Sequence, residues 1–288
     1  LKTLAMKRIL VPIDFSSISE KVLRFAANIA HKTGGNITAC HLIAPETINT
    51  VGIYHDVKVI NEQKELNSLK RLQRLGKKAS TEFPGIIIST VVHRRPVVGN
   101  ILKFAKDNYI DLIVMGTQGA SGLQKVTVGS VAAKVISQSD IPVLLVPEKY
   151  TPAPLKNIVF TTNFDTADGQ AFPFLFKLAG YLDAVITFVS LAKPNKKSSD
   201  EIEKNMESYG YVLQREYNDA KMQFRQLITT SVTDSLENLY HEVPYDLMVM
   251  ARRKLGWSSR FFKQSFTKKM AHITTLPLLI IPEKEVAL

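Results

Sequence analysis

The 288 residues are enough for one large domain or two ordinary ones. Hydrophobic residues make up 45% of the chain, yet no apolar run reaches the roughly 18 residues that span a bilayer, which excludes a membrane-spanning protein. The net charge of +11 favours an anionic partner, and the single cysteine, Cys40, excludes an internal disulfide and a thiolate metal cage. No signal peptide is visible, residues 1–5 are expected to lie outside the fold, and the chain is expected to be cytoplasmic.

Apolar runs of strand length alternate with helical patterns along the first half of the chain. Strands are expected near 7–13, 37–43, 86–92, 111–116 and 142–147, and helices near 17–32, 60–82, 97–108 and 129–138. Because the strand runs are rich in Val and Ile, they predict a parallel sheet that is covered by helices on both faces. Ser17 and Glu20 predict a capping box for the first helix, and residues 44–58 and 193–200 are expected to be surface loops.

The second half repeats the first. The matched segments are Asp111–Gly116 with Asp246–Ala251, Ile141–Pro147 with Leu276–Pro282, and Arg8–Phe15 with Asn157–Phe164. The first two pairs lie 135 positions apart and the third lies 149 apart, so the second copy is shorter in its middle. A repeat of this length predicts two tandem α/β modules. The predicted boundaries are 6–148 for the first domain, 149–155 for the linker and 156–284 for the second domain.

A glycine-rich loop follows the fourth predicted strand. Gly116 and Gly119 are separated from Gly129 and Ser130 by nine residues, which gives the pattern G-x2-G-x9-G-S between a buried strand and a helix. Glycines permit positive φ and let the backbone approach a ligand, while the N–H groups at a helix start favour phosphate. If the first and fourth strands are neighbours, Asp14 would face this loop, either as a cap of the first helix or as an acceptor for a ribose or base, and the two roles can coexist.

The Val-Pro-Ile-Asp-Phe-Ser opening at 11–16, the His41-Leu42 end of the second strand and the G-x2-G-x9-G-S loop together resemble the universal stress protein family. The resemblance covers nearly the whole chain and implies a tandem member with two doubly wound five-stranded parallel sheets in the order 3-2-1-4-5, an adenine nucleotide alpha hydrolase-like fold. It also implies ATP, with or without Mg²⁺, and His41 would be structural. By position, the residues around adenine and ribose would be Pro12, Ile13, Asp14 and Leu42, and those along ribose and phosphates would be Met115, Gly116, Gly119, Gly129, Ser130 and Val131.

The second copy departs from this pattern. Ala251, Lys254 and Gln264 stand where the first copy has its glycines, Ser265 keeps the serine, and Asn163 replaces the aspartate. Side chains would then occupy the space that phosphate needs, so a second ATP site is not expected. A basic stretch follows: Arg252, Arg253, Lys254, Arg260, Lys263, Lys268 and Lys269. It is expected to be a solvated face, and whether Arg252–Lys254 bind another anion stays open, as does a packing role for Trp257.

No catalytic residue and no metal ligand is predicted. The common nucleophile, phosphate-loop and zinc patterns are absent, and the six histidines are scattered. We therefore expect an ATP-binding stress-response sensor or regulator rather than a conventional enzyme. Two alternatives stay open, a slow ATP hydrolase or phosphotransfer enzyme and a nucleic-acid-binding basic protein, the latter less favoured. The final strands, 142–147 and 277–282, are expected to pair in an intramolecular pseudo-dimer, and association into a homodimer is left open.

Overall fold

A computed structural model of the chain describes residues 6–44, 54–117, 129–162, 164, 166–192, 196–228, 239–252 and 276–283. The chain divides into two compact units, and the division falls between Ile141 and Pro142. We refer to these as the N-terminal unit and the C-terminal unit. The predicted boundary at residue 148 differs from this division, and the domain boundaries stay a prediction.

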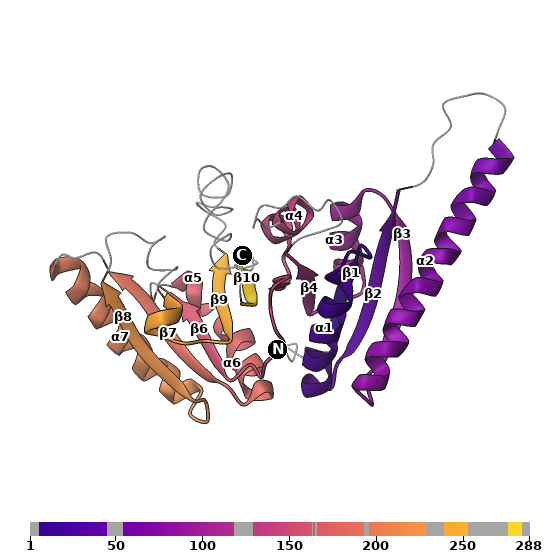
Figure 1. The fold of residues 1–288 in the computed structure, drawn as a ribbon. Coiled ribbons are helices and arrows are strands. Elements are labelled where there is room, and N and C mark those ends of the chain that lie inside the picture. Colours follow the sequence, from indigo (N-terminus) through magenta and orange to yellow (C-terminus); the bar gives the residue numbers. More distant parts are fainter. Residues whose placement is uncertain are drawn as a thin grey trace. The chain divides into compact units, whose positions relative to one another are not determined.

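The N-terminal unit alternates strands and helices as the sequence predicts (Figure 1). Its elements are β1 (Arg8–Ile13), α1 (Ser19–Thr33), β2 (Asn36–Ile43), α2 (Tyr54–Glu82), β3 (Ile88–Arg94), α3 (Val97–Asp107), β4 (Leu112–Gly116) and α4 (Ser130–Gln138). Parallel pairing joins β1 to both β2 and β4, and β2 to β3, which gives the order β3-β2-β1-β4. The α/β fold with a parallel sheet is confirmed.

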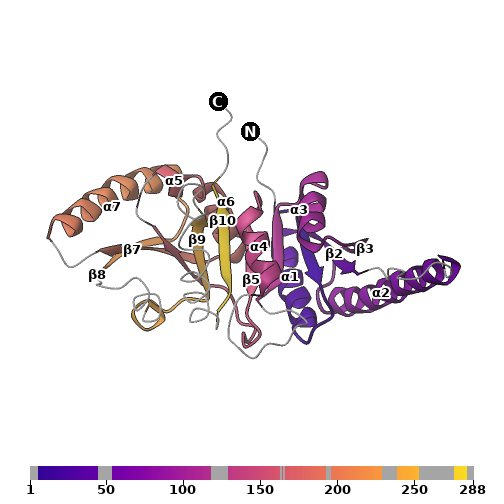
Figure 2. The same cartoon turned by 90° about the horizontal axis from the view of Figure 1, so that it is seen from above.

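Helices cover both faces of this sheet. Figure 2 shows α1 and α2 on one face and α3 on the other. The sequence explains this arrangement, since Ile9, Leu10 and Val11 of β1 are all buried, as a strand with two covered faces requires. On α1, Val22 and Ile29 lie two turns apart on the buried side of the helix.

The C-terminal unit contains the second copy and also the last strand of the first. Its elements are β5 (Val143–Val146), β6 (Asn157–Thr161), α5 (Thr166–Gly169), α6 (Phe172–Leu182), β7 (Val185–Ala192), α7 (Lys196–Glu216), β8 (Met222–Ile228), β9 (Leu247–Arg252) and β10 (Leu278–Pro282). The strand order is β5-β10-β9-β6-β7-β8. All of these pairs are parallel except β5 with β10, where Leu145 lies opposite Leu278. The expectation that the two final strands pair is confirmed, and the one antiparallel pair joins the last strand of the first copy to that of the second rather than two strands of the same copy.

Matched hydrogen bonds support the repeat. The Nζ of Lys7 donates to the carbonyl of Gly34 at 3.1 Å, and the Nζ of Lys156 donates to that of Asp183 at 3.1 Å. Both acceptors follow a helix and have left-handed φ, 62° at Gly34 and 50° at Asp183. Left-handed backbone favours glycine or a short polar residue, so both copies end this helix by the same physical device.

The predicted capping box is wrong. α1 begins at Ser19 with Ile18 at its N-cap, and no side chain caps it. The expectation of loops at 44–58 and 193–200 is also wrong in part, because α2 begins at Tyr54 and α7 at Lys196. The first residues of α7, Lys196–Asp200, are all polar, so no apolar periodicity revealed that start. Across the described residues, no helix has the length and apolar character of a membrane span.

Candidate nucleotide-binding cavity

A cavity of about 380 Å³ opens at the carboxyl ends of the strands in the N-terminal unit. It is lined by Pro12, Ile13, Asp14, Ile18, Ser19, Val22, Leu42, Arg95, Val97, Ile101, Met115, Gly116, Thr117, Gly129, Ser130, Val131 and Ala132. Every predicted site residue that the structure describes lines this cavity, and Gly119 lies outside the described residues. That these residues bind a ligand stays a prediction.

The sheet topology brings these distant segments together. β1 lies between β2 and β4, so the chain runs outward through β2 and β3 and then crosses back to β4 on the other side of β1. Parallel strands have their carboxyl ends at one edge, and the crevice where the strand order reverses is where ligands bind in open α/β sheets. The ends of β1 at Ile13 and of β4 at Gly116 flank this crevice.

The start of α4 forms one wall of the cavity. Gly129 is the N-cap, no side chain caps the helix, and Ser130, Val131 and Ala132 of its first turn line the cavity. The first N–H groups of a helix have no intrahelical acceptor, and the helix dipole adds positive potential there, so this wall suits an anion. The N–H of Gly129 donates to the carbonyl of Thr117 at 2.6 Å, which closes the connection back to the end of β4.

The glycines act through size rather than through unusual backbone angles. Gly129 has φ −58° and ψ 151°, a conformation open to any residue, and Gly116 is not among the residues with positive φ. The freedom of glycine to adopt positive φ is therefore not used at either position. What remains is the absence of a Cβ at the cavity wall, which lets a ligand approach the backbone.

Asp14 follows β1 and holds the loop that leads into α1. Its Oδ1 accepts hydrogen bonds from the N–H of Ser16 at 3.0 Å, from the hydroxyl of Ser16 at 2.6 Å and from the hydroxyl of Ser19 at 3.0 Å. The expectation that Asp14 caps α1 is wrong, because Ile18 is the N-cap and no side chain caps the helix, but the carboxylate does tie the loop to the hydroxyl of Ser19 at the helix start. The role of Asp14 toward a ligand stays a prediction. Asp14 is the only carboxylate among the described residues that line the cavity.

His41 links β2 to the end of β1. Its Nδ1–H donates to the carbonyl of Ile13 at 2.7 Å, next to Asp14, and its ring lies 4.4 Å from that of Phe15. Burial lowers the pKa of His41, the hydrogen bond to Ile13 opposes this, and the charge of Arg71 lowers it further. The imidazole is therefore neutral near pH 7 and fixes the strand ends, as expected for a structural residue.

Comparison with known proteins identifies the family. The sequence profile of the Universal stress protein family matches residues 6–147. A universal stress protein of Methanocaldococcus jannaschii is 31% identical over 140 residues, which cover 49% of this chain and 81% of the relative. The chain belongs to the universal stress protein family. Universal stress protein YxiE of Bacillus subtilis is also 31% identical, over 146 residues that cover 48% of this chain and 97% of YxiE.

A solved structure extends the likeness in fold to both copies. The crystal structure of a universal stress protein from Archaeoglobus fulgidus aligns with a TM-score of 0.72 and covers 98% of this chain and 99% of that chain. Its sequence identity is 16%, so it supports the fold alone. This chain is therefore a universal stress protein whose two halves together match the fold of a single solved chain.

Several residues that line the cavity were not predicted from the sequence. They are Ile18, Ser19, Val22, Arg95, Val97, Ile101, Thr117 and Ala132. Those on α1 and α3 belong to apolar helix faces, and nothing in the pattern separates a cavity wall from core. Arg95 follows the end of β3 directly, and in the part of the chain that the structure describes its side chain makes no hydrogen bond or ion pair. Its place after a strand was a signal that could have identified it.

The C-terminal unit has different side chains at the equivalent strand ends. The hydroxyl of Thr162 donates to Asp168 at 2.6 Å and accepts from the N–H of Phe164 at 2.8 Å, and both polar side chains are buried. Arg252, at the end of β9, is also buried. The expectation that the basic stretch is a solvated face is therefore wrong at Arg252, because the side chain turns inward where the strand ends.

Asn163 and the other residues named for the altered loop of the second copy lie outside the described residues: Arg253, Lys254, Trp257, Gln264 and Ser265. The absence of a second ATP site and the nucleic-acid alternative therefore stay predictions. Among the described side chains, no group of three His, Cys, Asp or Glu residues is arranged to hold a metal ion.

Proposed function

We propose that this universal stress protein binds ATP in the cavity of its N-terminal unit and acts as a nucleotide-responsive regulator in the stress response. The observation that supports this is the uncapped start of α4, which lines a cavity together with Asp14 and the end of β4. The cavity combines a wall of N–H donors with apolar walls. This is the combination that a nucleotide requires.

The triphosphate would lie against the first turn of α4. Ser130, Val131 and Ala132 supply N–H groups without intrahelical acceptors, and the hydroxyl of Ser130 adds a donor. A negative charge at a helix start gains about 0.3–1 kcal/mol from the dipole, and more where water is excluded. Gly129 keeps this wall free of a side chain, which a phosphate oxygen would otherwise meet.

The base would occupy the opposite side of the cavity. Val22 of α1, Leu42 of β2 and Ile101 of α3 line it with aliphatic groups, and Leu42 comes from the strand on the other side of β1 from β4. The transfer of a planar base from water to such apolar walls has a favourable free energy. Asp14, which also lines the cavity, would accept a hydrogen bond from a ribose hydroxyl.

We propose binding rather than turnover as the activity. A general base must reach the attacking water and be available to accept its proton. Asp14 is the only carboxylate that the described lining offers, and its Oδ1 already accepts three hydrogen bonds. A slow hydrolase stays the alternative, and the nucleotide that remains after long incubation distinguishes the two.

The test is direct. The full chain is purified without added nucleotide and denatured, the released small molecules are separated by chromatography, and ATP is then titrated by calorimetry with and without Mg²⁺. We expect saturable binding, and we expect Gly129→Gln to weaken it by at least about tenfold, because the new side chain fills the phosphate wall. Ser137→Ala, at the far end of α4, is the matched control. Failure of the folded wild-type protein to bind ATP at millimolar concentration would overturn the proposal.

A further inference from the structure

Exposed apolar side chains gather on the two long helices, α2 and α7. Half of the large apolar side chains that are exposed in the described part of the chain lie there: Val59, Ile60 and Leu66 on α2, and Tyr211 and Val212 on α7. The two helices are equivalent elements, since α2 joins the second and third strands of the first copy and α7 joins those of the second copy. Exposed apolar side chains that gather on one element are typical of a protein-binding surface.

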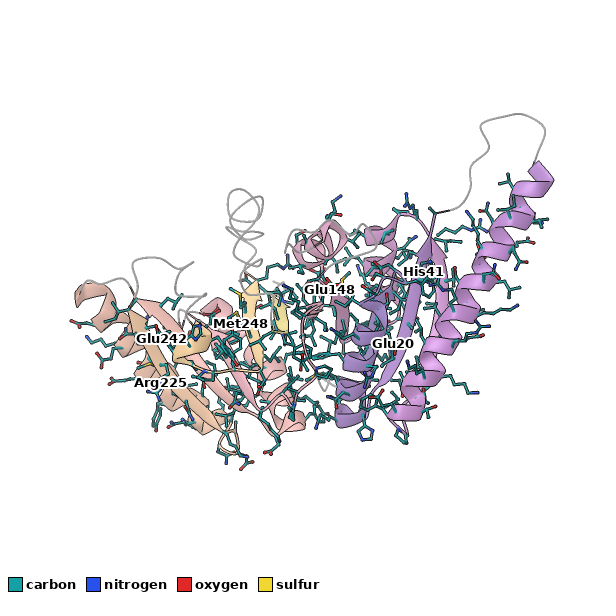
Figure 3. All side chains as sticks on the ribbon, in the orientation of Figure 1. Glu20, His41, Glu148, Arg225, Glu242 and Met248 are labelled. Atoms are coloured by element: carbon teal, nitrogen blue, oxygen red, sulfur yellow. The ribbon has the colours of Figure 1, made fainter. Side chains whose placement is uncertain are left out.

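The outer side of α2 is basic along its second half. Lys70, Arg74 and Lys77 follow the i, i+4, i+7 spacing that places side chains on one side of a helix, and buried Leu72 lies on the other side. Figure 3 shows side chains projecting from α2 on the side away from the sheet. The three cations are exposed, and to the described residues none of their side chains makes an ion pair. Like charges one helical turn apart repel one another, so an acidic partner would stabilise this side of α2.

The outer side of α7 is acidic. Asp200, Glu203 and Glu207 follow the i, i+3, i+7 spacing, all three are exposed, and none forms an ion pair with another described residue. Residues 200–207 contain four acids and one cation, Lys204. The three carboxylates lie beyond the first turn of the helix, so a favourable interaction with the helix dipole does not account for them. The charge on this helix is therefore opposite to that on α2.

The two outer sides match position by position when the helices run antiparallel. Along each helix the matched residues are three or four apart, and the order of these steps in α7 is the reverse of that in α2. The opposed pairs are Lys77 with Asp200, Arg74 with Glu203, Lys70 with Glu207, Leu66 with Tyr211, and Glu62 with Arg215. We call the two sets of residues the α2 face and the α7 face. All ten residues are exposed, every charged pair has opposite signs, and the uncharged pair is apolar.

From this match we infer that the α2 face of one chain binds the α7 face of a second copy of the chain. Leu66 and Tyr211 would be buried against each other, and ion pairs would surround them. Opposite charges in register also fix the antiparallel direction, because a parallel arrangement would break the match. Exposed ion pairs are individually weak and one helix pair is a small interface, so we expect reversible association in the micromolar range. The inference does not depend on ATP binding in the cavity.

The first experiment measures the mass of the folded full chain by analytical ultracentrifugation. The concentration is varied from about 5 to about 500 μM in about 0.1 M salt and again in about 1 M salt. At the lower salt concentration the weight-average mass should rise with protein concentration above that of one chain. At the higher salt concentration the rise should largely disappear, because screening weakens the ion pairs between exposed side chains.

Charge reversal on each face then tests which surfaces meet. One variant carries Lys70→Glu, Arg74→Glu and Lys77→Glu, and the other carries Asp200→Lys, Glu203→Lys and Glu207→Lys. Each variant alone should associate at least about tenfold more weakly than the wild type, because like charges then oppose each other. An equimolar mixture should recover the association. In the mixture the acidic α2 face of one variant meets the basic α7 face of the other, and the two unchanged faces also have opposite charges.

Two control variants separate these faces from net charge. They change the net charge by the same amounts at exposed positions outside both faces: Lys32→Glu, Lys134→Glu and Lys149→Glu in one, and Asp140→Lys, Asp219→Lys and Glu242→Lys in the other. Each should associate within about threefold of the wild type. A wild type that stays monomeric, a mixture of folded variants that does not recover, or equal weakening in the controls would each overturn the inference. Loss of ATP binding would overturn only the proposed function.

Discussion

The hydroxyl of Ser19 donates a hydrogen bond of 3.0 Å to the carboxylate of Asp14, and both residues line the cavity. Through this bond the end of β1 is tied to the first turn of α1. The same carboxylate oxygen also holds the N–H and hydroxyl of Ser16. The cavity wall at this side is therefore fixed by hydrogen bonds before any ligand enters.

Asp14→Ala should lower the free energy of unfolding by about 1–2 kcal/mol, because it removes a charged acceptor of three hydrogen bonds. Asp14→Asn should lower the free energy of unfolding by less, since the amide oxygen of asparagine can still accept hydrogen bonds. Urea denaturation followed by circular dichroism measures both variants. An unchanged midpoint in Asp14→Ala would show that the loop does not depend on this carboxylate.

A matched pair of aspartates stabilises the two copies in the same way. The Oδ2 of Asp111 accepts from the N–H of Lys7 at 2.9 Å and of Arg8 at 3.0 Å, and the Oδ2 of Asp246 accepts from the N–H of Lys156 at 2.9 Å and of Asn157 at 2.8 Å.

We therefore expect Asp111→Ala and Asp246→Ala each to cost about 1–2 kcal/mol of stability, since each change leaves backbone N–H groups at a strand start without an acceptor. Amide hydrogen exchange distinguishes them. Protection should fall mainly in the N-terminal unit for Asp111→Ala and mainly in the C-terminal unit for Asp246→Ala. An equal loss across both units would contradict this.

Cys40 should be chemically inert in the native state. Its side chain is 1% exposed, and burial raises the pKa of the thiol to about 12. Because the thiolate is the reactive form, native protein at pH 8 should not release chromophore from a disulfide reagent, whereas protein in urea should release one equivalent per chain. Rapid labelling of the native protein would show that β2 opens readily.

Asp183 should give the C-terminal unit a dependence on acid pH. Hydrogen bonds from Lys221 at 2.7 Å and Lys156 at 2.9 Å lower the pKa of its carboxyl from 3.8 to about 2. A group whose pKa is depressed in the folded state contributes stability above its unfolded pKa and loses it as pH falls through the folded value.

The stability of wild type and Asp183→Asn should accordingly separate above pH 3.8 and converge as pH falls toward about 2. Asparagine tolerates the left-handed φ of 50° at this position, so the comparison isolates the charge. The difference should shrink in high salt, because the pair is exposed. Asp140→Asn, at an exposed position, is the control and should follow the wild-type curve.

The sequence alone predicted the alternation of strands and helices, because local periodicity indicates each element. It also predicted the duplication, because matched segments recur at fixed spacing. The resemblance to the universal stress protein family also predicted part of the cavity lining. Asp14, Leu42 and Gly129 are far apart in the chain, but each follows or ends a parallel strand or starts a helix, and parallel order sends such positions to one edge of the sheet.

Tertiary structure alone decided the rest. β5 pairs antiparallel with β10, and Arg252 turns into the interior. Each of these depends on which distant segment lies opposite a side chain. Local periodicity records only how a residue relates to its neighbours along the chain, so it cannot contain that information.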